Sequence, residues 1–217
     1  MSNKAFIFDL DGVIVDTAKY HFLAWKELAQ SLGFDFTEEQ NELLKGVSRV
    51  RSLEILLDIG KVELSREEKE KYLHEKNEQY LGYIAKMDTQ EILPGIPELL
   101  AFLKTEKIPF ALGSASKNAR LILENLSLLE DFDAIVDGND VSTAKPDPEV
   151  FLIAAEKLGK DPKECIVIED AFAGIQAANS AGMTSVAIGD PEVLTGADIN
   201  LSNTKELTID LARQLIR

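Results

Sequence analysis

Two carboxylates, Asp9 and Asp11, stand two residues apart near the start of the chain, and Gly12 follows them. The segment before them, residues 4–8, is short, apolar and aromatic, which is typical of a strand buried on both faces in a parallel sheet. A buried strand that ends in paired carboxylates needs a compensating charge, and a metal ion supplies it most simply. A single Asp-Gly dipeptide more often marks an ordinary turn, but a turn does not explain Asp9.

Polar residues follow other apolar runs in the same way. Ser114 comes after one predicted strand, and the pair Glu169 and Asp170 comes after another. Ligands in open α/β sheets bind beyond the carboxyl ends of the strands, so we expect these residues to meet Asp9 at one rim. The oxygen ligands of four such acids suit Mg²⁺, and no Cys/His cluster suggests zinc.

Hydroxyls and a lysine accompany the acids. Residues 114–118 stand between a predicted strand and a predicted helix, where main-chain N–H groups and hydroxyls can bind an anion, although Ser-x-Ser at this place more often caps the helix. Lys145 precedes a helix started by Pro148, and a lysine there would ordinarily be a solvated surface residue. Together, acids, hydroxyls and a lysine at one rim point to phosphoryl transfer.

Two regions of different character must position these residues. From residue 17 to residue 86 the sequence predicts only helices, with Gly33 as a C-cap and Ser48 and Ser65 as N-caps. These predicted helices cover residues 17–32, 38–44, 49–59 and 66–85.

From residue 93 onward, predicted helices alternate with apolar strands, which favours a parallel sheet covered on both faces. The predicted helices cover residues 96–106, 118–126, 148–158 and 173–181, and the strands cover residues 108–112, 134–136, 165–168 and 184–188. We therefore predict an α/β fold, a doubly wound, Rossmann-like parallel sheet with an inserted all-helical cap domain. The core domain is expected to comprise residues 1–15 and 93–217 and the cap residues 16–92, with hinges near residues 15–16 and 87–93.

Composition narrows the possible functions. The 217 residues carry a formal net charge of −15, so we expect no binding to nucleic acid or to an anionic membrane. The single cysteine, Cys165, lies in an apolar run and is expected to be a buried, inert thiol, which agrees with a reducing compartment. The apolar run at the N-terminus is too short and too charged for a signal peptide or a membrane span. We expect a cytoplasmic protein and, since no apolar stripe suggests an obligate oligomer, a monomer.

The motifs resemble, in this order, those of the haloacid dehalogenase (HAD) superfamily, in which Asp-x-Asp, Ser/Thr, Lys and a late acidic pair recur. The resemblance covers essentially the whole chain. It implies that Asp9 is the nucleophile that becomes an aspartyl phosphate and that Asp11 is the general acid/base. It also implies that Ser114 and Lys145 hold the transferring phosphoryl group. The implied Mg²⁺ ligands are Asp9, Asp11 through its main chain, Glu169 and Asp170.

The helical region carries a second set of candidate residues. Thr17, His21 and Trp25 are spaced along one helical face, where an aromatic residue is usually part of a core, although Thr and His make this stripe unusually polar. The basic segment Lys45-Gly46-Val47-Ser48-Arg49 lies between two predicted helices and could be a plain connector. Its Arg49 could instead clamp a second phosphate, with Lys76 as a further cation.

These residues resemble the β-phosphoglucomutase branch of the superfamily. The resemblance implies that Arg49, Ser116, Lys117 and Asn118 bind the phosphate that is not transferred. It implies a wider substrate-binding set around the sugar and Asp11, namely Thr17, His21, Trp25, Lys45, Gly46, Val47, Ser48, Ser52, Lys76 and Ala115. The basic side chains of this site would form a positively charged cleft on an otherwise acidic protein. They are Lys45, Arg49, Lys76, Lys117 and Lys145.

The activity that this branch implies is transfer of phosphate between C1 and C6 of β-D-glucose 1-phosphate and glucose 6-phosphate, through phosphorylated Asp9 and β-glucose 1,6-bisphosphate. Closure of the cap would exclude water. A sugar-phosphate phosphatase shares the core and the cap and remains the alternative, although it has less use for Arg49 and for residues 116–118. A catalytically inactive phosphosugar-binding protein is a third possibility, against which the intact Asp9, Asp11, Lys145 and Asp170 argue.

Overall fold

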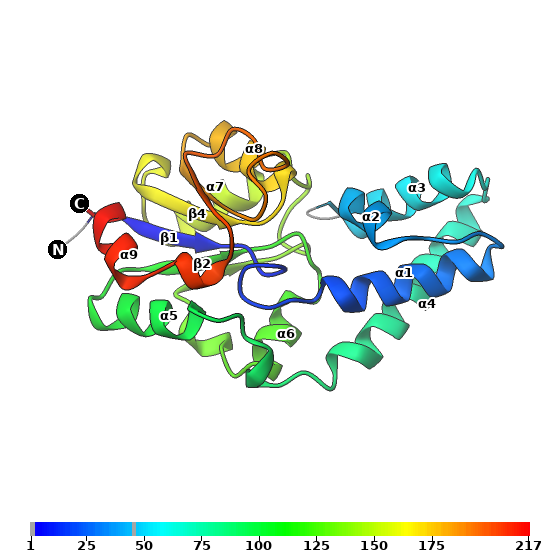
Figure 1. Ribbon diagram of the computed structural model, residues 1–217, viewed down its shortest axis with the longest axis horizontal. Helices are drawn as coiled ribbons and strands as arrows, with labels where there is room; N and C mark the ends of the chain where they lie inside the picture. The colour runs from blue at the N-terminus through cyan, green and yellow to red at the C-terminus, as the bar shows by residue number, and fades with distance from the viewer. Residues whose placement is uncertain (1–2, 45–46) are drawn as a thin grey trace.

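A parallel sheet forms the centre of the larger part of the molecule (Figure 1). The computed structural model describes residues 3–44 and 47–217. Its six strands lie in the order β3-β2-β1-β4-β5-β6, and every neighbouring pair is parallel. The strands are β1 (Ala5–Phe8), β2 (Phe110–Gly113), β3 (Ala134–Val136), β4 (Cys165–Glu169), β5 (Thr184–Ile188) and β6 (Ile199–Leu201).

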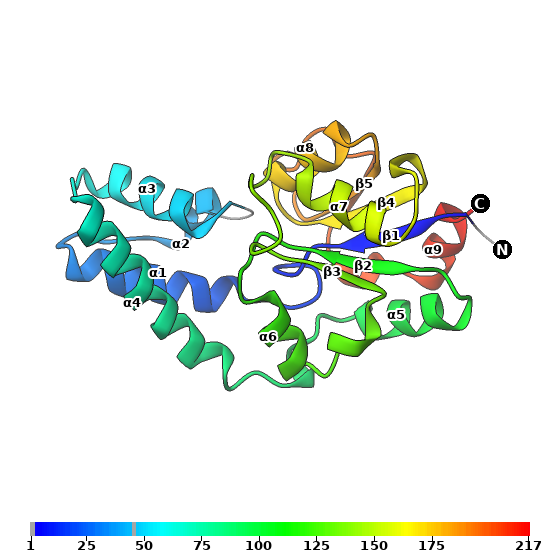
Figure 2. The ribbon, with the colours of Figure 1, turned by 180° about the vertical axis from the view of Figure 1, so that it is seen from behind.

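Helices cover both faces of this sheet, as the sequence predicts. Side chains alternate along β1, so that Phe6 and Phe8 enter one buried cluster while Ala5 and Ile7 enter another. The first cluster packs under α5 (Ile96–Thr105), α6 (Ala119–Asn125) and α9 (Ile209–Leu215), and the second under α7 (Glu149–Lys157) and α8 (Phe172–Ser180). The views from the two sides agree on this arrangement (Figures 1 and 2).

A separate group of helices lies beyond the carboxyl ends of the strands, opposite the two chain termini (Figure 2). It comprises α1 (Ala18–Ser31), α2 (Glu38–Asn41), the 3₁₀ turn Glu42–Leu44, α3 (Arg49–Gly60) and α4 (Arg66–Ile84). The predicted N-caps Ser48 and Ser65 are confirmed, since each hydroxyl accepts a hydrogen bond from the first turn. We call α1 to α4 the helical unit and the rest the sheet unit.

The helical unit has its own core. Trp25 and Leu28 of α1 pack there with Leu53 and Leu56 of α3. The long helix α4 is polar and buries only Lys76, Tyr80 and Ile84, which are spaced four residues apart and therefore form a single stripe. A lysine thus belongs to the inner face of this unit.

The two crossings between the units run side by side. Val15 pairs with Ile92 in an antiparallel bridge, and the Leu93 N–H donates to the Ile14 carbonyl at 2.9 Å. Glu91 also accepts a hydrogen bond from the Tyr20 hydroxyl at 2.8 Å. These contacts hold the two connecting segments together.

The structure departs from the predicted elements in a few places. The predicted strand at residues 108–112 begins only at Phe110, because Pro109 has no N–H to donate to a ladder. The predicted helix at residues 38–44 is divided into α2 and a 3₁₀ turn. Strand β6, helix α9 and four further 3₁₀ turns, Thr89–Glu91, Leu129–Asp131, Pro162–Glu164 and Thr204–Glu206, were not predicted.

Two smaller expectations can also be compared with the structure. Cys165 is fully buried, which confirms the prediction of a buried thiol, and burial raises the pKa of this thiol to about 11. Across residues 3–44 and 47–217, none of the helices has the length and apolar character needed to span a bilayer.

Candidate active site

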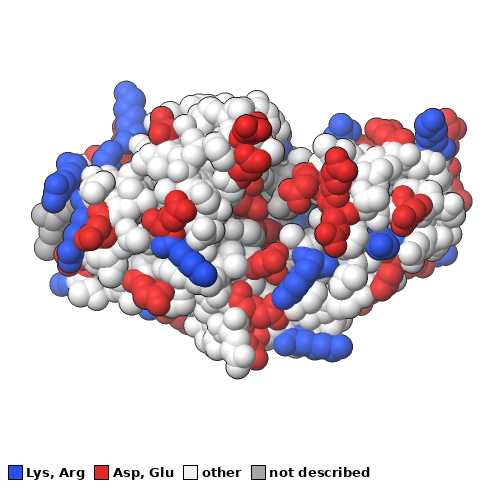
Figure 3. All heavy atoms as spheres, in the orientation of Figure 1, with Lys and Arg blue, Asp and Glu red and all other residues white. Residues whose placement is uncertain are grey.

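A pocket of about 510 Å³ lies between the strand ends and the helical unit. Both units contribute to its walls, and Figure 3 shows the hollow between them from one side, with acidic side chains along its edges. Most of the predicted site residues line it, namely Asp9, Asp11, His21, Trp25, Val47, Ser48, Arg49, Ser52, Lys76, Ser114, Ala115, Ser116, Lys117, Asn118, Lys145 and Asp170. Thr17 and Glu169 are buried behind this wall, and Lys45 and Gly46 lie outside the described residues.

A buried lysine joins two carboxylates at the sheet end of the pocket. The Lys145 Nζ lies 2.6 Å from Asp9 Oδ1 and 2.5 Å from Glu169 Oε1, although the three residues are far apart in the sequence. Burial alone would lower the pKa of Lys145, but the Asp9 and Glu169 carboxylates outweigh it and raise that pKa above its ordinary value. Burial raises the pKa of the Glu169 carboxyl, and Lys145 opposes this rise.

Carboxylate oxygens of Asp9, Glu169 and Asp170 approach within 4.8 Å of one another. Three hard oxygen donors in this arrangement fit a divalent cation such as Mg²⁺. Two glycines make room for them: a Cβ on Gly12 would lie 2.0 Å from Asp170 Oδ2, and one on Gly174 would lie 1.9 Å from Glu169 Oε1. The carboxylates of Asp170 and Glu169 can therefore occupy these places only because residues 12 and 174 are glycines.

Asp11 is positioned by its neighbours on both sides. Its main-chain N–H donates to Asp9 Oδ2 at 2.9 Å, and the buried Thr17 hydroxyl donates to Asp11 Oδ1. Thr17 is the N-cap residue of α1 but does not cap it with its side chain, whose hydroxyl is directed to Asp11, and Asp16 Oδ1 accepts the Ala18 N–H. Burial, and then the Asp9 carboxylate, raise the pKa of Asp11 to about 8. The surroundings of Asp11 therefore favour its protonated form.

The loop that follows β2 holds its hydroxyls against its own main chain. Ser114 Oγ accepts the Ser116 N–H at 3.1 Å, and Ser116 Oγ accepts the Asn118 N–H at 3.2 Å. The Asn118 side chain does not cap α6 but donates to Asn77 Oδ1 of α4 at 3.0 Å. This hydrogen bond connects the loop to the helical unit.

The helical wall of the pocket holds a second buried lysine. Lys76 Nζ lies 2.8 Å from His21 Nδ1, 4.6 Å from the centre of the Trp25 ring and 4.8 Å from the centre of the Tyr80 ring. Burial, and then the charge of Arg49, lower the pKa of Lys76 to about 7. Burial, and then Lys76, likewise lower the pKa of His21 well below its ordinary value. The positive groups Lys76 and Arg49 therefore lie close together here, with Asp11 as the nearby carboxylate that favours the charged form of Lys76.

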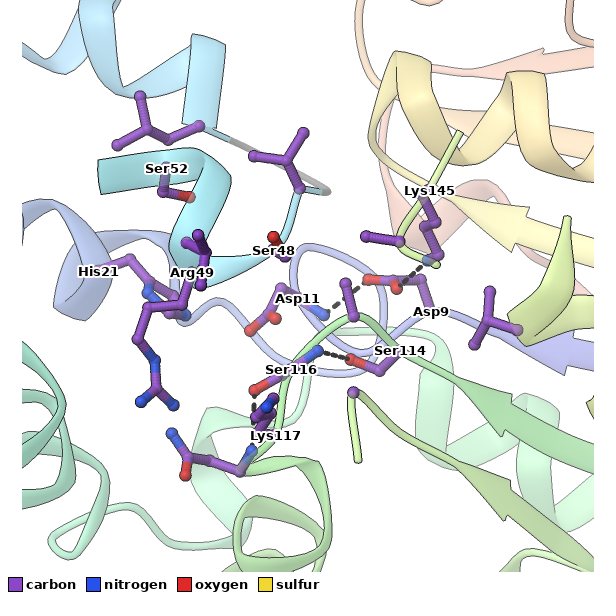
Figure 4. A pocket seen from close by; sticks show the side chains of 18 of the residues that line it. Asp9, Asp11, His21, Ser48, Arg49, Ser52, Ser114, Ser116, Lys117 and Lys145 are labelled. Atoms are coloured by element: carbon purple, nitrogen blue, oxygen red, sulfur yellow. Dashed lines mark hydrogen bonds and ion pairs between the residues drawn. The ribbon is translucent and has the colours of Figure 1, made fainter. Parts of the chain in front are cut away.

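The pocket thus has two polar ends. Figure 4 shows Asp9 and Lys145 at one end, Arg49 and Lys117 at the other, and Asp11 with Ser116 between them. The first end presents carboxylates that can act as a nucleophile, an acid or metal ligands. The second presents cations and amides suited to a phosphate.

Sequence reasoning missed several residues of this site. Tyr80 stacks on His21 at 4.1 Å between ring centres, and its position four residues after Lys76 on α4 was a signal that could have found it. Gly174 and Asn77 carried no such signal, because their roles depend on contacts with Glu169 and Asn118 that the folded chain creates.

Comparison with known proteins gives a consistent family. The sequence model of haloacid dehalogenase-like hydrolases matches residues 3–182. The chain is 46% identical over 213 residues to a β-phosphoglucomutase of Bacillus subtilis, a match that covers 97% of this chain and 94% of the relative. It is 34% identical over 185 residues to a phosphorylated carbohydrates phosphatase of Thermotoga maritima, covering 84% and 83%. A crystal structure of β-phosphoglucomutase from Clostridium difficile superposes with a TM-score of 0.93 at 44% identity, covering 98% of this chain and 96% of that one.

Proposed function

Because this chain belongs to the haloacid dehalogenase-like hydrolase family, we propose that it is a phosphomutase that interconverts β-D-glucose 1-phosphate and glucose 6-phosphate. The observation that carries the proposal is the presence of two polar ends in one pocket of about 510 Å³. A mutase must hold two phosphates at once, one over its nucleophile and one at a distance. The similarity to two β-phosphoglucomutases over nearly the whole chain supports the same activity.

Asp9 is the proposed nucleophile. One of its carboxylate oxygens forms a bond to phosphorus while the bond from phosphorus to the sugar oxygen breaks. Lys145 contacts Asp9 Oδ1 at 2.6 Å and is therefore positioned to offset charge on the transferring phosphoryl group, with Ser114 beside it. In the other half of the reaction, phosphorylated Asp9 donates its phosphoryl group to the free hydroxyl of a sugar monophosphate, which forms the bisphosphate, and the bond from phosphorus to Asp9 breaks.

Asp11 is the proposed general acid and base. Its raised pKa, about 8, favours its protonated form, so it can give its proton to the sugar oxygen that leaves phosphorus. It then takes a proton from the hydroxyl that attacks phosphorylated Asp9. The Thr17 hydroxyl holds Asp11 Oδ1 during both steps.

The second phosphate is assigned to Arg49, Ser116, Lys117 and Asn118. With His21, Trp25, Val47, Ser48, Ser52, Lys76 and Ala115, these residues would enclose the sugar, and Lys45 and Gly46 complete the predicted set. The intermediate β-glucose 1,6-bisphosphate would present each of its phosphates in turn to Asp9. A phosphorylated hexose is thus the expected partner of this pocket.

The acid cluster is the proposed Mg²⁺ site. Asp9, Glu169 and Asp170 would hold the ion, with the main chain of Asp11, and their oxygen atoms fit it in type and spacing. When bound, Mg²⁺ would neutralise charge on the phosphoryl oxygens.

A division into two domains would allow the active site to close and exclude water. We assign residues 1–15 and 93–217 to the core and residues 16–92 to the cap, with hinges at the paired crossings around Val15 and Ile92. Closure of the cap would protect phosphorylated Asp9 from hydrolysis. We further infer a monomer in the cytoplasm that binds neither nucleic acid nor membrane.

A sugar-phosphate phosphatase is the second candidate, favoured by the Thermotoga relative at 34% identity. The two functions separate in one assay with β-glucose 1-phosphate, Mg²⁺ and a trace of glucose 1,6-bisphosphate. Glucose 6-phosphate is followed with a coupled dehydrogenase while inorganic phosphate is measured in parallel. We expect glucose 6-phosphate with little free phosphate, whereas free phosphate as the main product would establish the phosphatase.

A further inference from the structure

The turn at residues 137–140, which follows β3, contacts the loop that follows β2. The Gly138 N–H donates to the Ser116 carbonyl at 3.2 Å. The Asn139 side chain donates from Nδ2 to the Lys117 carbonyl at 3.1 Å. Two successive carbonyls of the loop are therefore held from outside by one turn.

These contacts orient main-chain donors. In a trans peptide the N–H points opposite to the C=O, so the Lys117 N–H, which shares a peptide with the Ser116 carbonyl, points away from the turn. This N–H meets no acceptor among residues 3–44 and 47–217, while Ser116 and Lys117 both line the pocket. A main-chain donor is thus left for a ligand beside the Lys117 ammonium.

Hydrogen bonds and ion pairs hold the turn at residues 137–140 in place. The Asp140 N–H donates to the Asp137 carbonyl at 2.9 Å, and the Asp137 N–H donates to Asp140 Oδ2 at 2.9 Å. Arg120 of α6 pairs with both acids, its Nε at 3.1 Å from Asp137 Oδ2 and its Nη2 at 3.2 Å from Asp140 Oδ2. Asp137 is 1% exposed, which limits screening of its ion pair.

The approach of the turn to the loop also requires glycine. A Cβ on Gly138 would lie 2.4 Å from the Ala115 carbonyl oxygen, a contact that main-chain atoms cannot relieve without moving. The turn can therefore approach the loop this closely only with glycine at residue 138.

We propose that Gly138 and Asn139 are positioning residues for the second phosphate site, because they hold the carbonyls of Ser116 and Lys117 so that the Lys117 N–H and side chain face the ligand's phosphate. This inference rests on the proposed function in one respect, that the phosphate held here is the one that is not transferred. Asn139 lies outside the pocket lining, and Gly138, which lines the pocket, offers no side chain to a ligand.

The first test compares Asn139→Ala with the unaltered protein. Loss of one hydrogen bond to the loop should raise KM for β-glucose 1-phosphate about three- to tenfold and change kcat by less than about twofold. Phosphorylation of Asp9 by acetyl phosphate, which carries a single phosphate, should keep its rate. A general structural defect would slow both reactions, and an unchanged KM would overturn the proposal. Asn139→Gln retains an amide donor and should restore part of the affinity.

The second variant is Gly138→Ala, which must displace the loop and should raise KM at least about tenfold. Asn200→Ala, at an exposed position of β6, is the matched control and should leave KM and kcat unchanged. The binding of glucose 6-phosphate, measured by titration calorimetry with each variant, does not depend on turnover. If the unaltered protein proves to be a phosphatase, weaker calorimetric binding by Asn139→Ala still supports the positioning role, and equal binding overturns it.

Discussion

Two lysines are buried to nearly the same extent in the two units, and their charges are treated in opposite ways. Lys145 in the sheet unit is 4% exposed and Lys76 in the helical unit is 2% exposed. Lys145 contacts two carboxylates, which raise its pKa, whereas Lys76 faces a histidine and two aromatic rings, and its pKa falls to about 7. Lys145 is paired with two carboxylates before any ligand arrives, whereas the charge of Lys76 is left for an anionic ligand to balance.

This difference suits the two phosphate sites. The sheet end performs bond making and needs Asp9 and its partners held in one geometry. The helical end must release one phosphate and accept another when the bisphosphate turns over, so a permanent ion pair with Lys76 would compete with the ligand. Four variants test this comparison, from the largest expected effect to the smallest.

Lys145→Met should be the most damaging change. It leaves the Asp9 and Glu169 carboxylates buried together without a cation, which costs about 3–5 kcal/mol of the free energy of unfolding. Activity should fall at least about 10²-fold with the loss of charge at the phosphoryl group. Urea unfolding in EDTA and in MgCl₂ measures the stability, and Mg²⁺ should restore part of it. The exposed Lys163→Met is the control, and equal stability of the two variants would contradict the account.

Lys76→Met should lower activity about 10-fold or more while stabilising the free protein. The unfolded lysine keeps its proton up to pH about 10.5, whereas the folded one loses it near pH 7. Between these values the unfolded state binds more protons, so the penalty of burying the ammonium is complete below pH 7 and fades as the pH rises toward 10.5.

Thermal unfolding as a function of pH measures this effect. The melting temperature should rise by about 2–4 °C for each kcal/mol recovered, most strongly at acidic pH. Lys71→Met, an exposed substitution on the same helix, should change it little at any pH. A loss of stability for Lys76→Met at acidic pH would show that Lys76 has a resident partner.

Gly174→Ala should weaken the acid cluster, because the added Cβ would lie 1.9 Å from Glu169 Oε1. We expect a loss of about 1–3 kcal/mol from crowding and about tenfold weaker Mg²⁺ binding, measured by calorimetry. Gly82→Ala in α4 is the matched change in the helical unit, where a Cβ would meet no atom within 4 Å. It should stabilise the protein by about 0.5–1 kcal/mol. Equal effects at both glycines would contradict the close packing of Glu169.

Tyr80→Phe should have the smallest effect. The Tyr80 hydroxyl is buried beside the Thr17 hydroxyl but makes no hydrogen bond of good geometry among the described residues, and the ring stays stacked on His21 after its removal. The free energy of unfolding should therefore be unchanged or slightly higher. Tyr20→Phe, by contrast, removes a hydrogen bond to Glu91 and should cost about 0.5–1.5 kcal/mol. A comparable loss at Tyr80 would reveal a partner for its hydroxyl.

The sheet end of the site could be predicted almost completely from the sequence. Asp9 and Ser114 directly follow β1 and β2, and Glu169 ends β4, so one rule about strand ends brought them together. The rule works because each residue is adjacent in sequence to the strand that places it. The family resemblance predicted the same residues independently.

The helical end was less accessible to sequence reasoning. The contacts of Lys76 with His21 and of Asn118 with Asn77 join residues 55 and 41 positions apart, and nothing in local spacing selects these partners. The hydrogen bond from the Asn139 side chain to the Lys117 carbonyl could not be predicted from the sequence either, because it forms only where two separate loops meet in the fold. Strand β6 and helix α9 were not predicted, and β6 lacks the continuous apolar run that marked the equally short β3, because its central residue is the exposed Asn200.

The most direct test of the central claim follows the phosphoryl group on Asp9 through a single turnover. The protein is mixed with β-glucose 1,6-bisphosphate whose phosphates carry ³²P, in the presence of excess unlabelled β-glucose 1-phosphate and Mg²⁺, and the products are separated by chromatography. If the two ends of the pocket hold two phosphates and exclude water, nearly all of the label will appear in sugar phosphates. Release of most of the label as inorganic phosphate would contradict the account and identify a hydrolase.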